Sequence, residues 1–428
     1  MKEYEKQTKE MLQFIEKSPT AFHAVENLAG MAEQAGYTEL KETEEWDLKP
    51  GCGYYVIRGG SSIAAFRLPE GTDPAPAGFH IVAAHSDSPT FKLKENAEIE
   101  VEGHYTKLNT EPYGGMILST WLDRPLSVAG RVTLKKEGKL INRLVNVDRD
   151  LLVIPNVAIH MSKELNQGMT YNAQTDMTPL FGDVKDKKGF LKLIAKAACA
   201  KEEDVLAYDL FLYVRDKGRL IGAEGEYVLS PRLDDLQCAF AAMTAMTRTK
   251  PDAYLNICAV FDNEEVGSRT RQGADSTFLS DILERIKEAF SESEIWLRRR
   301  IADSLLISAD NAHAVHPNHP EKADPTNRPY LNGGIVIKYH GSQRYTTDST
   351  TAAALKTLCE EAKVPMQTFA NRSDLVGGST LGNISAAHVS VPSVDIGLPQ
   401  LAMHSAVETA GVKDTLYAVR LFEQFYVK

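Results

Sequence analysis

The residues best suited to chemistry directly follow one apolar run. Residues 257–261, Ile-Cys-Ala-Val-Phe, have the character of a buried strand, and an Asp-Asn pair ends it. Two adjacent carboxylates, Glu264 and Glu265, come next. Because adjacent side chains after a strand can point in different directions, one carboxylate can bind a metal ion while its neighbour acts as a general base. A solvated acidic turn is the alternative interpretation of such a pair taken alone.

Four other stretches carry possible metal ligands, and most of them lie where an apolar strand ends. They contribute His85 with Asp87, Asp234 with Asp235, Asp310, and His404. In open α/β sheets, functional sites form in the crevice outside the carboxyl ends of the strands. Imidazole and carboxylate ligands without thiolates suit zinc, cobalt or manganese, and one bridging carboxylate would allow a two-metal site.

Each of these stretches also has a plain structural interpretation. His85 could be a hydrogen-bonded turn residue, the Asp234-Asp235 pair could cap a helix, and Asp310 could belong to a turn. Five such coincidences in one chain are hard to assign to turns. Their conjunction therefore favours a two-metal hydrolase.

Strand and helix signals alternate in the regions that carry these residues, which predicts an α/β domain with a mixed sheet. The expected helices are 4–17, 20–34, 233–247, 278–290, 349–362 and 413–426, and the expected strands are 54–57, 63–68, 79–84, 255–261, 305–308, 335–339 and 393–397. Between them, residues 91–227 alternate polar and apolar residues and show little helical periodicity before a helix at 191–200. We expect this middle block to be a strand-rich insertion. Residues 1–90 and 228–428 would then build one sheet together.

Composition narrows the class of protein. The chain has 428 residues, enough for two domains, and its net charge of −10 argues against a nucleic-acid partner. The five cysteines are scattered and odd in number, which is typical of reduced core residues. The N-terminus lacks the apolar core of a signal peptide, and no run of 18 apolar residues occurs. We therefore expect a cytoplasmic protein without a membrane-spanning segment.

The motifs resemble those of one family. The strings HSDSP at 85–89, SPRLDDL at 230–236, FDNEEVGS at 261–268, SADNAHAVHPN at 308–318 and LPQLAMHS at 398–405 are similar in order and spacing to the M18 metalloaminopeptidases, the aspartyl aminopeptidase family. The resemblance implies a metallo-exopeptidase fold and a cytosolic enzyme that removes one N-terminal residue from peptides with a free N-terminus. It also implies two divalent metal ions, usually zinc, and a tetrahedral homododecamer whose inserted domain, residues 91–227, makes contacts between subunits.

By position in the family pattern, Asp234 would bridge the two metal ions. The resemblance assigns the remaining ligands to His85, Glu265, Asp310 and His404. Glu264 would be the general base that takes a proton from the attacking water, and Asp87 would orient His85. Anchoring the free α-amine of the substrate at the metal ions would make the enzyme an exopeptidase.

The same resemblance assigns substrate-binding roles to His160, His313, Lys338, Tyr345 and Met403. His160 matches a histidine that family members contribute to a neighbouring subunit's site. Lys338 could pair with an acidic side chain of the substrate. The stretch NRSDLVGGSTLG at 371–382 differs from acid-selective members, so a preference for acidic or for neutral residues such as Leu stays open.

Two other functions remain as alternatives. A carboxypeptidase or amidohydrolase of the same clan would need an arginine for a substrate carboxylate, for which Arg344 and Arg372 are the candidates. A non-catalytic assembly or binding protein would have lost its metal ligands, whereas every ligand and the general base are present here.

Overall fold

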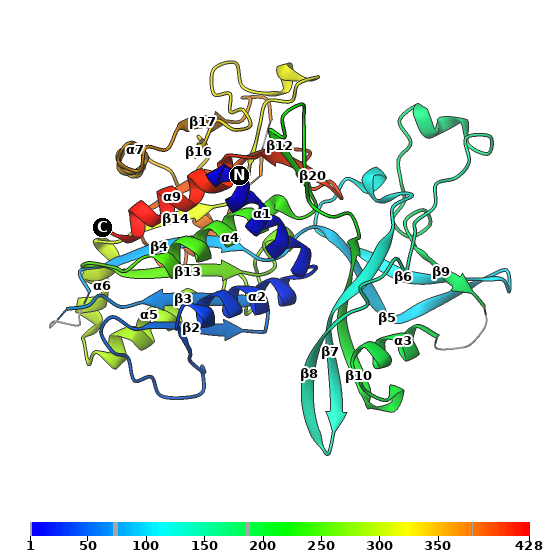
Figure 1. Ribbon diagram of the computed structural model, residues 1–428, viewed down its shortest axis with the longest axis horizontal. Helices are drawn as coiled ribbons and strands as arrows, with labels where there is room; N and C mark the ends of the chain where they lie inside the picture. Colours follow the sequence, from blue (N-terminus) through cyan, green and yellow to red (C-terminus); the bar gives the residue numbers. More distant parts are fainter. Residues whose placement is uncertain (1, 72–75, 185–188, 376, 379) are drawn as a thin grey trace. The chain divides into compact units, whose positions relative to one another are not determined.

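The computed structural model describes residues 2–71, 76–184, 189–375, 377–378 and 380–428. The chain divides into two compact units (Figure 1). The first contains Met1–Asp87, Gly218–Met403 and Glu408–Lys428, and the second contains Ser88–Lys217 and His404–Val407. Within the described residues, no helix has both the length and the apolar character that crossing a membrane requires.

Nine described strands of the first unit form one mixed sheet, in the order β1-β2-β3-β13-β4-β14-β18-β16-β17. Their bounds are β1 Thr38–Glu39, β2 Gly53–Arg58, β3 Ser62–Arg67, β4 Phe79–His85, β13 Leu255–Phe261, β14 Leu305–Ala309, β16 Ile335–Tyr339, β17 Met366–Ala370 and β18 Ser393–Gly397. Strands from both sides of the middle block are interleaved, since β13 pairs with both β3 and β4. The prediction that the N-terminal and C-terminal parts share a sheet is confirmed.

Helices cover both faces of this sheet (Figure 1). Their bounds are α1 Glu3–Lys17, α2 Ala21–Gln34, α4 Leu233–Arg248, α5 Phe278–Ala289, α6 Glu294–Ala302, α7 Ser349–Ala362, α8 Leu381–Ser385 and α9 Asp414–Tyr426. One core joins the sheet to α1, α2, α4, α7 and α9, and the other joins it to α5, α6 and α8. The first unit therefore has the expected α/β fold, with its large sheet between two layers of helices.

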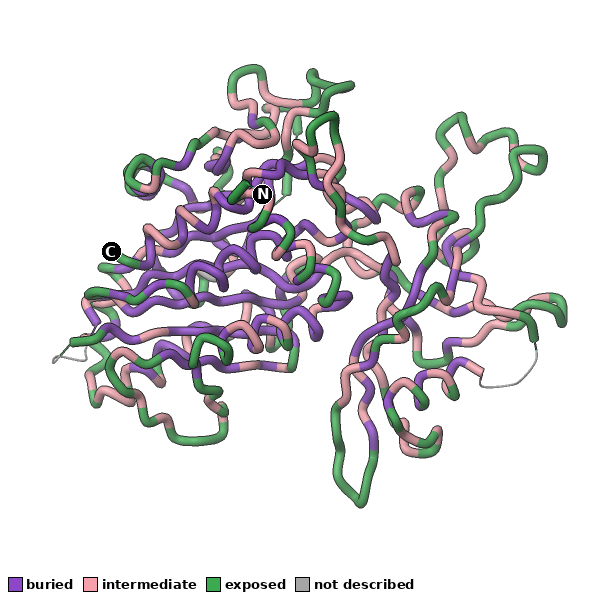
Figure 2. The backbone as a smooth tube through the Cα atoms, viewed as in Figure 1, coloured by how far each residue is buried: buried purple, intermediate pink, exposed green. Residues whose placement is uncertain are grey.

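The central strands β4 and β13 are buried along their whole length, as Figure 2 shows. Successive side chains of a strand point to opposite faces. Accordingly, Val82 and Val260 pack in one core, whereas Ile81 and Ile257 pack in the other. This two-sided burial explains why these strands appear in the sequence as continuous apolar runs instead of alternating patterns.

A smaller sheet of the first unit has the order β11-β12-β20-β19-β15. Its strands are β11 Arg219–Ile221, β12 Tyr227–Ser230, β15 Ala312–His313, β19 Pro399–Leu401 and β20 Glu408–Gly411. We expected residues 218–227 in the insertion, but β11 pairs with β12, and β12 with β20, inside the first unit. These strands are too short for their periodicity to reveal their partners.

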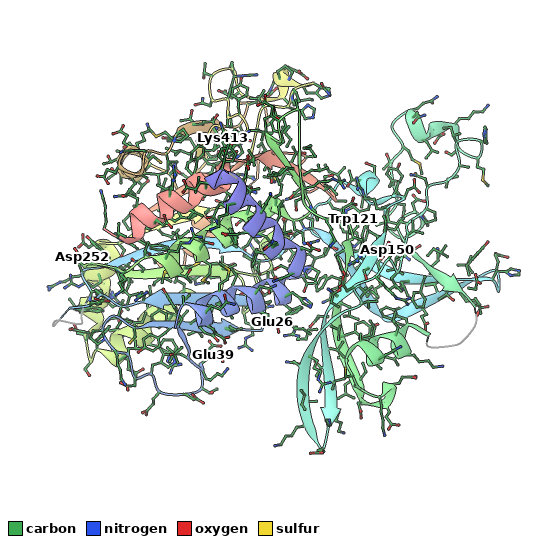
Figure 3. All side chains as sticks on the ribbon, viewed as in Figure 1. Glu26, Glu39, Trp121, Asp150, Asp252 and Lys413 are labelled. Carbon is green, nitrogen blue, oxygen red and sulfur yellow. The ribbon has the colours of Figure 1, made fainter. Side chains whose placement is uncertain are left out.

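The second unit is built on a six-stranded antiparallel sheet, in the order β8-β7-β10-β5-β6-β9. The bounds are β5 Thr90–Val101, β6 Tyr105–Tyr113, β7 Leu126–Lys136, β8 Lys139–Asn146, β9 Leu180–Asp183 and β10 Val205–Val214, with helix α3 at Gly189–Ala197. Its core is mainly aliphatic and includes an aromatic pair, since Trp121, labelled in Figure 3, meets the Phe91 ring edge-on at 5.3 Å. The strand-rich character expected for this block is observed.

Candidate active site

Parallel pairing brings the candidate residues to one edge of the large sheet. Strand β4 lies between β13 and β14 and runs parallel to both. His85 ends β4, Glu264 and Glu265 follow β13, and Asp310 follows β14. Because the carboxyl ends of parallel strands meet at the same edge, the three segments converge there.

The start of α4 supplies the fourth segment. Its backbone N–H at Asp234 donates to the Glu408 carboxylate at 3.0 Å. Asp235 accepts the backbone N–H of His85 at 3.1 Å, so this carboxylate holds the end of β4. The neighbouring Asp234 carboxylate instead lies 3.5 Å from the His85 ring nitrogen Nε2. The two adjacent acids therefore have different partners.

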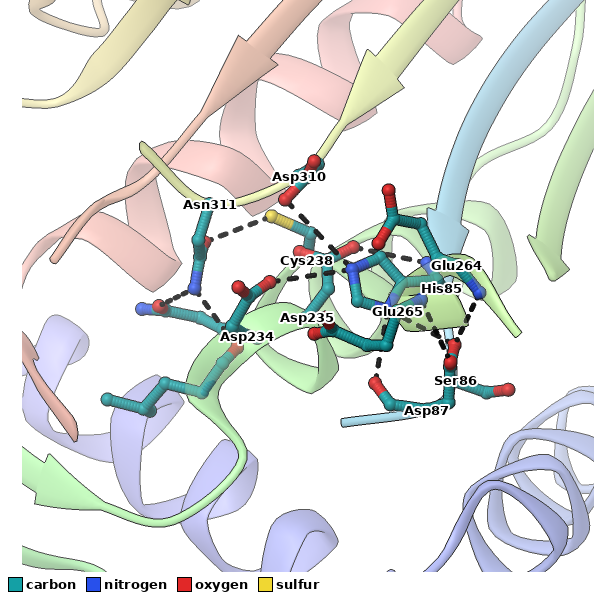
Figure 4. Close-up of polar contacts among 12 residues, drawn as sticks. His85, Ser86, Asp87, Asp234, Asp235, Cys238, Glu264, Glu265, Asp310 and Asn311 are labelled. Atoms are coloured by element: carbon teal, nitrogen blue, oxygen red, sulfur yellow. Dashed lines mark hydrogen bonds and ion pairs between the residues drawn. The ribbon is translucent and has the colours of Figure 1, made fainter. Parts of the chain in front are cut away.

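His85, Asp234 and Asp310 form a compact set of possible ligands (Figure 4). One ligand atom from each lies within 4.8 Å of the others, and all three residues are buried. A second set, His85 with Glu264 and Glu265, meets the same limit. One imidazole surrounded by carboxylates is a donor set that fits a divalent cation such as zinc.

The two ring nitrogens of His85 have different partners. Nδ1 lies 3.1 Å from the backbone oxygen of Asp87 and 3.4 Å from its carboxylate, which favours the tautomer with the proton on Nδ1. Nε2 faces Asp234 and, at 4.0 Å, Asp310. The nitrogen that carries the lone pair is thus directed toward the carboxylates.

Asp87 also orders the turn that carries the two glutamates. Its carboxylate oxygens accept the backbone N–H groups of Glu264 and Glu265, each at 3.2 Å. Left-handed residues flank the turn, Asn263 with φ 62° and Gly267 with φ 95°, and both residue types tolerate this conformation. One side chain therefore links His85 to the Glu264–Glu265 turn.

The electrostatics of the cluster favour a bound cation. Burial, together with the negative charges of Asp310, Glu265 and Asp87, outweighs the opposing effect of His85 and raises the pKa of Glu264 to about 8. Burial likewise raises the pKa of Asp235 well above its usual range, with Asp310 and Asp234 adding to the effect. A divalent cation among these groups would offset their mutual repulsion, so the residues present fit such an ion.

Lys338 is buried beside this cluster, and it is 3% exposed. Its ammonium lies 3.7 Å from the Asp310 carboxylate and 5.5 Å from the centre of the Tyr345 ring. Burial opposes the charge of Lys338, but Asp310 and Tyr345 more than compensate and raise its pKa. We had expected Lys338 to meet a substrate side chain, and the structure gives its charge a protein partner.

The other predicted substrate-binding residues have varied surroundings. Tyr345 is buried, Met403 is half-buried, and His313 is exposed with its ring 6.0 Å from that of Phe369. His160 is exposed and belongs to the second unit. Their predicted roles remain predictions. In the 371–382 stretch, residues 376 and 379 lie outside the described residues.

His404 belongs to the short segment that clusters with the second unit. Its Nδ1 lies 2.8 Å from the backbone oxygen of Gly115 in the same unit. As at His85, such a contact favours a proton on Nδ1 and leaves the lone pair on Nε2. Metal binding by His404 remains a prediction.

Two further polar residues at the site went unnoticed in the sequence. Glu408, which holds Asp234, is 2% exposed, and its position among apolar and small residues in VETAGV was the available signal. Asn311 is also 2% exposed, and its side chain contacts four other residues. We had interpreted the Asp310-Asn311 pair only as a ligand followed by a possible turn.

The converging imidazole and carboxylates beyond the central strands define a metal-dependent hydrolase. Comparisons with known proteins identify its family. The family model described as aminopeptidase I zinc metalloprotease (M18) matches residues 14–426. A probable M18 family aminopeptidase 2 from Clostridium novyi is 48% identical over 432 residues, covering 100% of both chains. The chain therefore belongs to the M18 family and is an aminopeptidase, a peptide hydrolase.

Solved structures support the same conclusion. Ape4 in its complex with Nbr1 superimposes with a TM-score of 0.95 at 37% identity, covering 99% of this chain and 86% of that one. The mApe1 dodecamer of Saccharomyces cerevisiae gives a TM-score of 0.87 at 28% identity, covering 99% of this chain and 97% of that one. The predicted family and fold are confirmed.

Proposed function

We propose that this aminopeptidase uses two divalent metal ions, zinc in the native enzyme, to remove the N-terminal residue of peptides. The observation that supports a metal site best is the buried set of His85, Asp234 and Asp310, beside which Glu265 supplies a further carboxylate. In the proposed assignment, Asp234 would bridge the ions, His85 and Asp310 would complete one ligand set, and Glu265 and His404 would complete the other. Cobalt and manganese suit the same donors.

The ions, when bound, would supply Lewis acidity toward the scissile carbonyl and lower the pKa of water. Glu264 would take the proton from the attacking water and deliver it to the leaving amine. Asp87 supports this role, because its hydrogen bond to the Glu264 backbone positions the turn. His313 would stabilise the oxyanion. The free α-amine of the substrate, bound in its neutral form, would restrict cleavage to the first residue.

For the substrate side chain, we propose acidic residues, with Lys338 as the cation beside Tyr345 and Met403. The buried ammonium of Lys338 supports this preference, because an acidic side chain would find a positive charge in a dry pocket. Neutral residues such as Leu are the second candidate. The ion pair between Lys338 and Asp310 favours them, because it already compensates the lysine charge.

We also propose that the first unit is the catalytic domain and that the second unit makes contacts between subunits. The dodecameric relative supports a homo-oligomer, for which we propose a tetrahedral dodecamer built from dimers. In such an assembly His160 would reach the active site of a neighbouring subunit. We place the enzyme in the cytoplasm, acting on peptides without nucleic-acid or membrane partners.

The experiment that tests this function is hydrolysis of aminoacyl p-nitroanilides carrying Asp, Glu, Leu and Lys. The protein is dialysed against a chelator and resupplied with Zn²⁺, Co²⁺ or Mn²⁺, and N-acetylated substrates serve as controls. Metal-dependent cleavage of free but not acetylated substrates is expected, and the ranking of side chains decides between acidic and neutral preference. Cleavage of acetylated substrates, or no turnover by folded, assembled protein, would contradict the proposed mechanism.

A further inference from the structure

The side chain of Asn311 joins segments that are far apart in the sequence (Figure 4). Asn311 follows Asp310 directly and is 2% exposed. Its amide nitrogen donates to the Leu233 backbone oxygen at 3.0 Å and to Gln400 Oε1 at 3.0 Å, and Gln237 Oε1 lies at 3.3 Å. Its amide oxygen accepts the Cys238 thiol at 3.3 Å. Both ends of this buried amide are therefore used.

These partners belong to the segment that carries Asp234. Leu233 is the preceding residue, and Cys238 lies in the first turns of α4. The Cys238 thiol also interacts with the carboxylate of Asp235, which in turn accepts the His85 backbone N–H. A series of contacts thus leads from Asn311 through Cys238 and Asp235 to His85. These contacts link the segments that carry all three residues of the first ligand set.

A primary amide suits this position better than any other small side chain. The Leu233 and Gln400 oxygens require two N–H donors, whereas the thiol requires an acceptor, and Asn supplies all three on one planar group. Aspartate would offer no N–H donor and would place another negative charge beside Asp310 and Asp235. Alanine would leave the buried oxygens without this donor.

Resting on the proposed function, we propose that Asn311 is a positioning residue that sets the separation between Asp310 and Asp234 required for metal binding. Residues behind metal ligands orient them, and their loss lowers metal affinity or activity by about 10- to 100-fold. Both amide atoms of Asn311 are engaged in hydrogen bonds to protein groups, so we assign neither as a metal ligand. It acts through the backbone at Leu233 and through its own covalent link to Asp310.

The test compares the purified full-length oligomer of the wild type with Asn311→Ala. The readouts are Zn²⁺ affinity, measured by competition with a chromophoric chelator, and the d–d absorption spectrum of the Co²⁺ form. The matched control is Asn256→Ala, which removes another buried asparagine. Asn256 lies near the start of β13, and its amide donates to the Tyr426 backbone oxygen at 2.7 Å. Thermal unfolding of the metal-free proteins reports the stability lost by each variant.

We expect Asn311→Ala to lower Zn²⁺ affinity by about 10- to 100-fold and to change the Co²⁺ spectrum, while Asn256→Ala keeps both. Wild-type affinity and spectrum in Asn311→Ala, with only a loss of stability like that of the control, would overturn the proposal. If Asn311→Ala does not fold, Gln400→Met is tested in its place. This replacement removes the Gln400 oxygen that accepts from the Asn311 amide, with little change in side-chain volume. Unchanged metal affinity in Gln400→Met would then overturn the proposal, and a reduced affinity would support it.

Asp310→Asn separates this proposal from the proposed function. If the wild type binds Zn²⁺ and Asp310→Asn binds it weakly, the assignment of Asp310 as a metal ligand is supported. The measurements on Asn311→Ala then test only whether Asn311 positions the ligands. If the wild type binds no metal, or Asp310→Asn binds as the wild type does, the ligand assignment fails and the positioning role fails with it.

Discussion

At the scale of single residues, Asp87 connects two functions of the site. Its carboxylate lies beside His85 Nδ1 and accepts the backbone N–H groups of both glutamates. A change in the orientation of His85 would therefore also change the turn that carries Glu264. The two hydrogen bonds from Asp87 therefore fix the backbone that carries both glutamate side chains.

Glu264→Gln is expected to lower kcat by about 10²- to 10⁴-fold, because the amide cannot take a proton from water. The metal content should remain that of the wild type, since Glu264 is assigned no ligand role. Steady-state hydrolysis and elemental analysis of the same sample measure both quantities. Glu360→Gln, on the exposed face of α7, is the control and should retain full activity. Full activity in Glu264→Gln would refute its assignment as the base.

At the scale of elements, close contact between strand ends determines where the ligands lie. Gly397 ends β18, which pairs with β14, and a Cβ atom at Gly397 would lie 2.3 Å from the backbone oxygen of Asp310. The same atom would lie 2.8 Å from the backbone nitrogen of Ala312. Since both contacts are with backbone, no rotation of a side chain can relieve them. The Asp310 segment can take its position only because residue 397 is glycine.

Gly397→Ala is therefore expected to displace Asp310 and to weaken metal binding as well as stability, by about 1–3 kcal/mol for the overpacking. Zn²⁺ competition and thermal unfolding measure the two effects. Gly30→Ala on α2 is the control, because a Cβ atom there meets nothing within 4 Å. That replacement should leave metal binding unchanged and add about 0.5–1 kcal/mol of stability. Wild-type metal affinity in Gly397→Ala would contradict the expected displacement.

His80 in β4 makes the stability of the first unit sensitive to acid. Its ring stacks on Tyr254 with centroids 4.1 Å apart and lies 4.4 Å from the Phe425 ring. Burial lowers the pKa of His80 to about 4 from its ordinary value of 6.5. Because the unfolded chain binds this proton more readily, the contribution of His80 to stability is complete above pH 6.5 and is lost as pH falls toward 4.

His80→Phe keeps an aromatic ring in this position and removes the titration. Between pH 6.5 and 4, the wild type should lose up to about 3 kcal/mol that the variant retains. Urea unfolding at several pH values measures the difference. Replacement of the exposed His104 by Phe is the control and should follow the wild type. Parallel pH profiles for His80→Phe and the wild type would show that His80 does not cause the acid sensitivity.

At the scale of the whole molecule, the predicted site residues are divided between the two units. The first unit contains both ligand sets around His85, and the second unit contains His160 on its exposed surface. In the proposed oligomer, each active site would combine Glu264 from one subunit with His160 from another. Activity would then depend on the interface and not only on the fold of one subunit.

Hybrid oligomers test this dependence. His160→Ala and Glu264→Gln are each expected to be poorly active alone. When the two variants are dissociated and reassembled together at equal amounts, about a quarter of the sites should regain both residues by random mixing. Hydrolysis is measured before and after mixing, and size-exclusion chromatography with light scattering verifies assembly. No recovery in verified hybrids would contradict a contribution of His160 to a neighbouring site.

The sequence by itself determined the elements and the residue types of the site. Strand β13 has the predicted bounds, and β4, β14, β16, β18 and the long helices lie within a few residues of those expected. These elements carry strong local signals, because buried parallel strands are continuous apolar runs and amphipathic helices repeat every 3.6 residues. Motif order then identified the family, since ligands at strand ends are constrained by chemistry as well as by fold.

Only the tertiary structure decided which side chains meet. Nothing local in the sequence indicates that Glu408 holds Asp234, that Lys338 pairs with Asp310, or that Asn311 reaches Leu233. These partners come from separate segments, and their distances depend on strand order and on the packing of α4 against the sheet. Sequence periodicity reports burial but not the neighbour across a buried contact. The ligand types could therefore be predicted, whereas the groups that hold them in place required the fold.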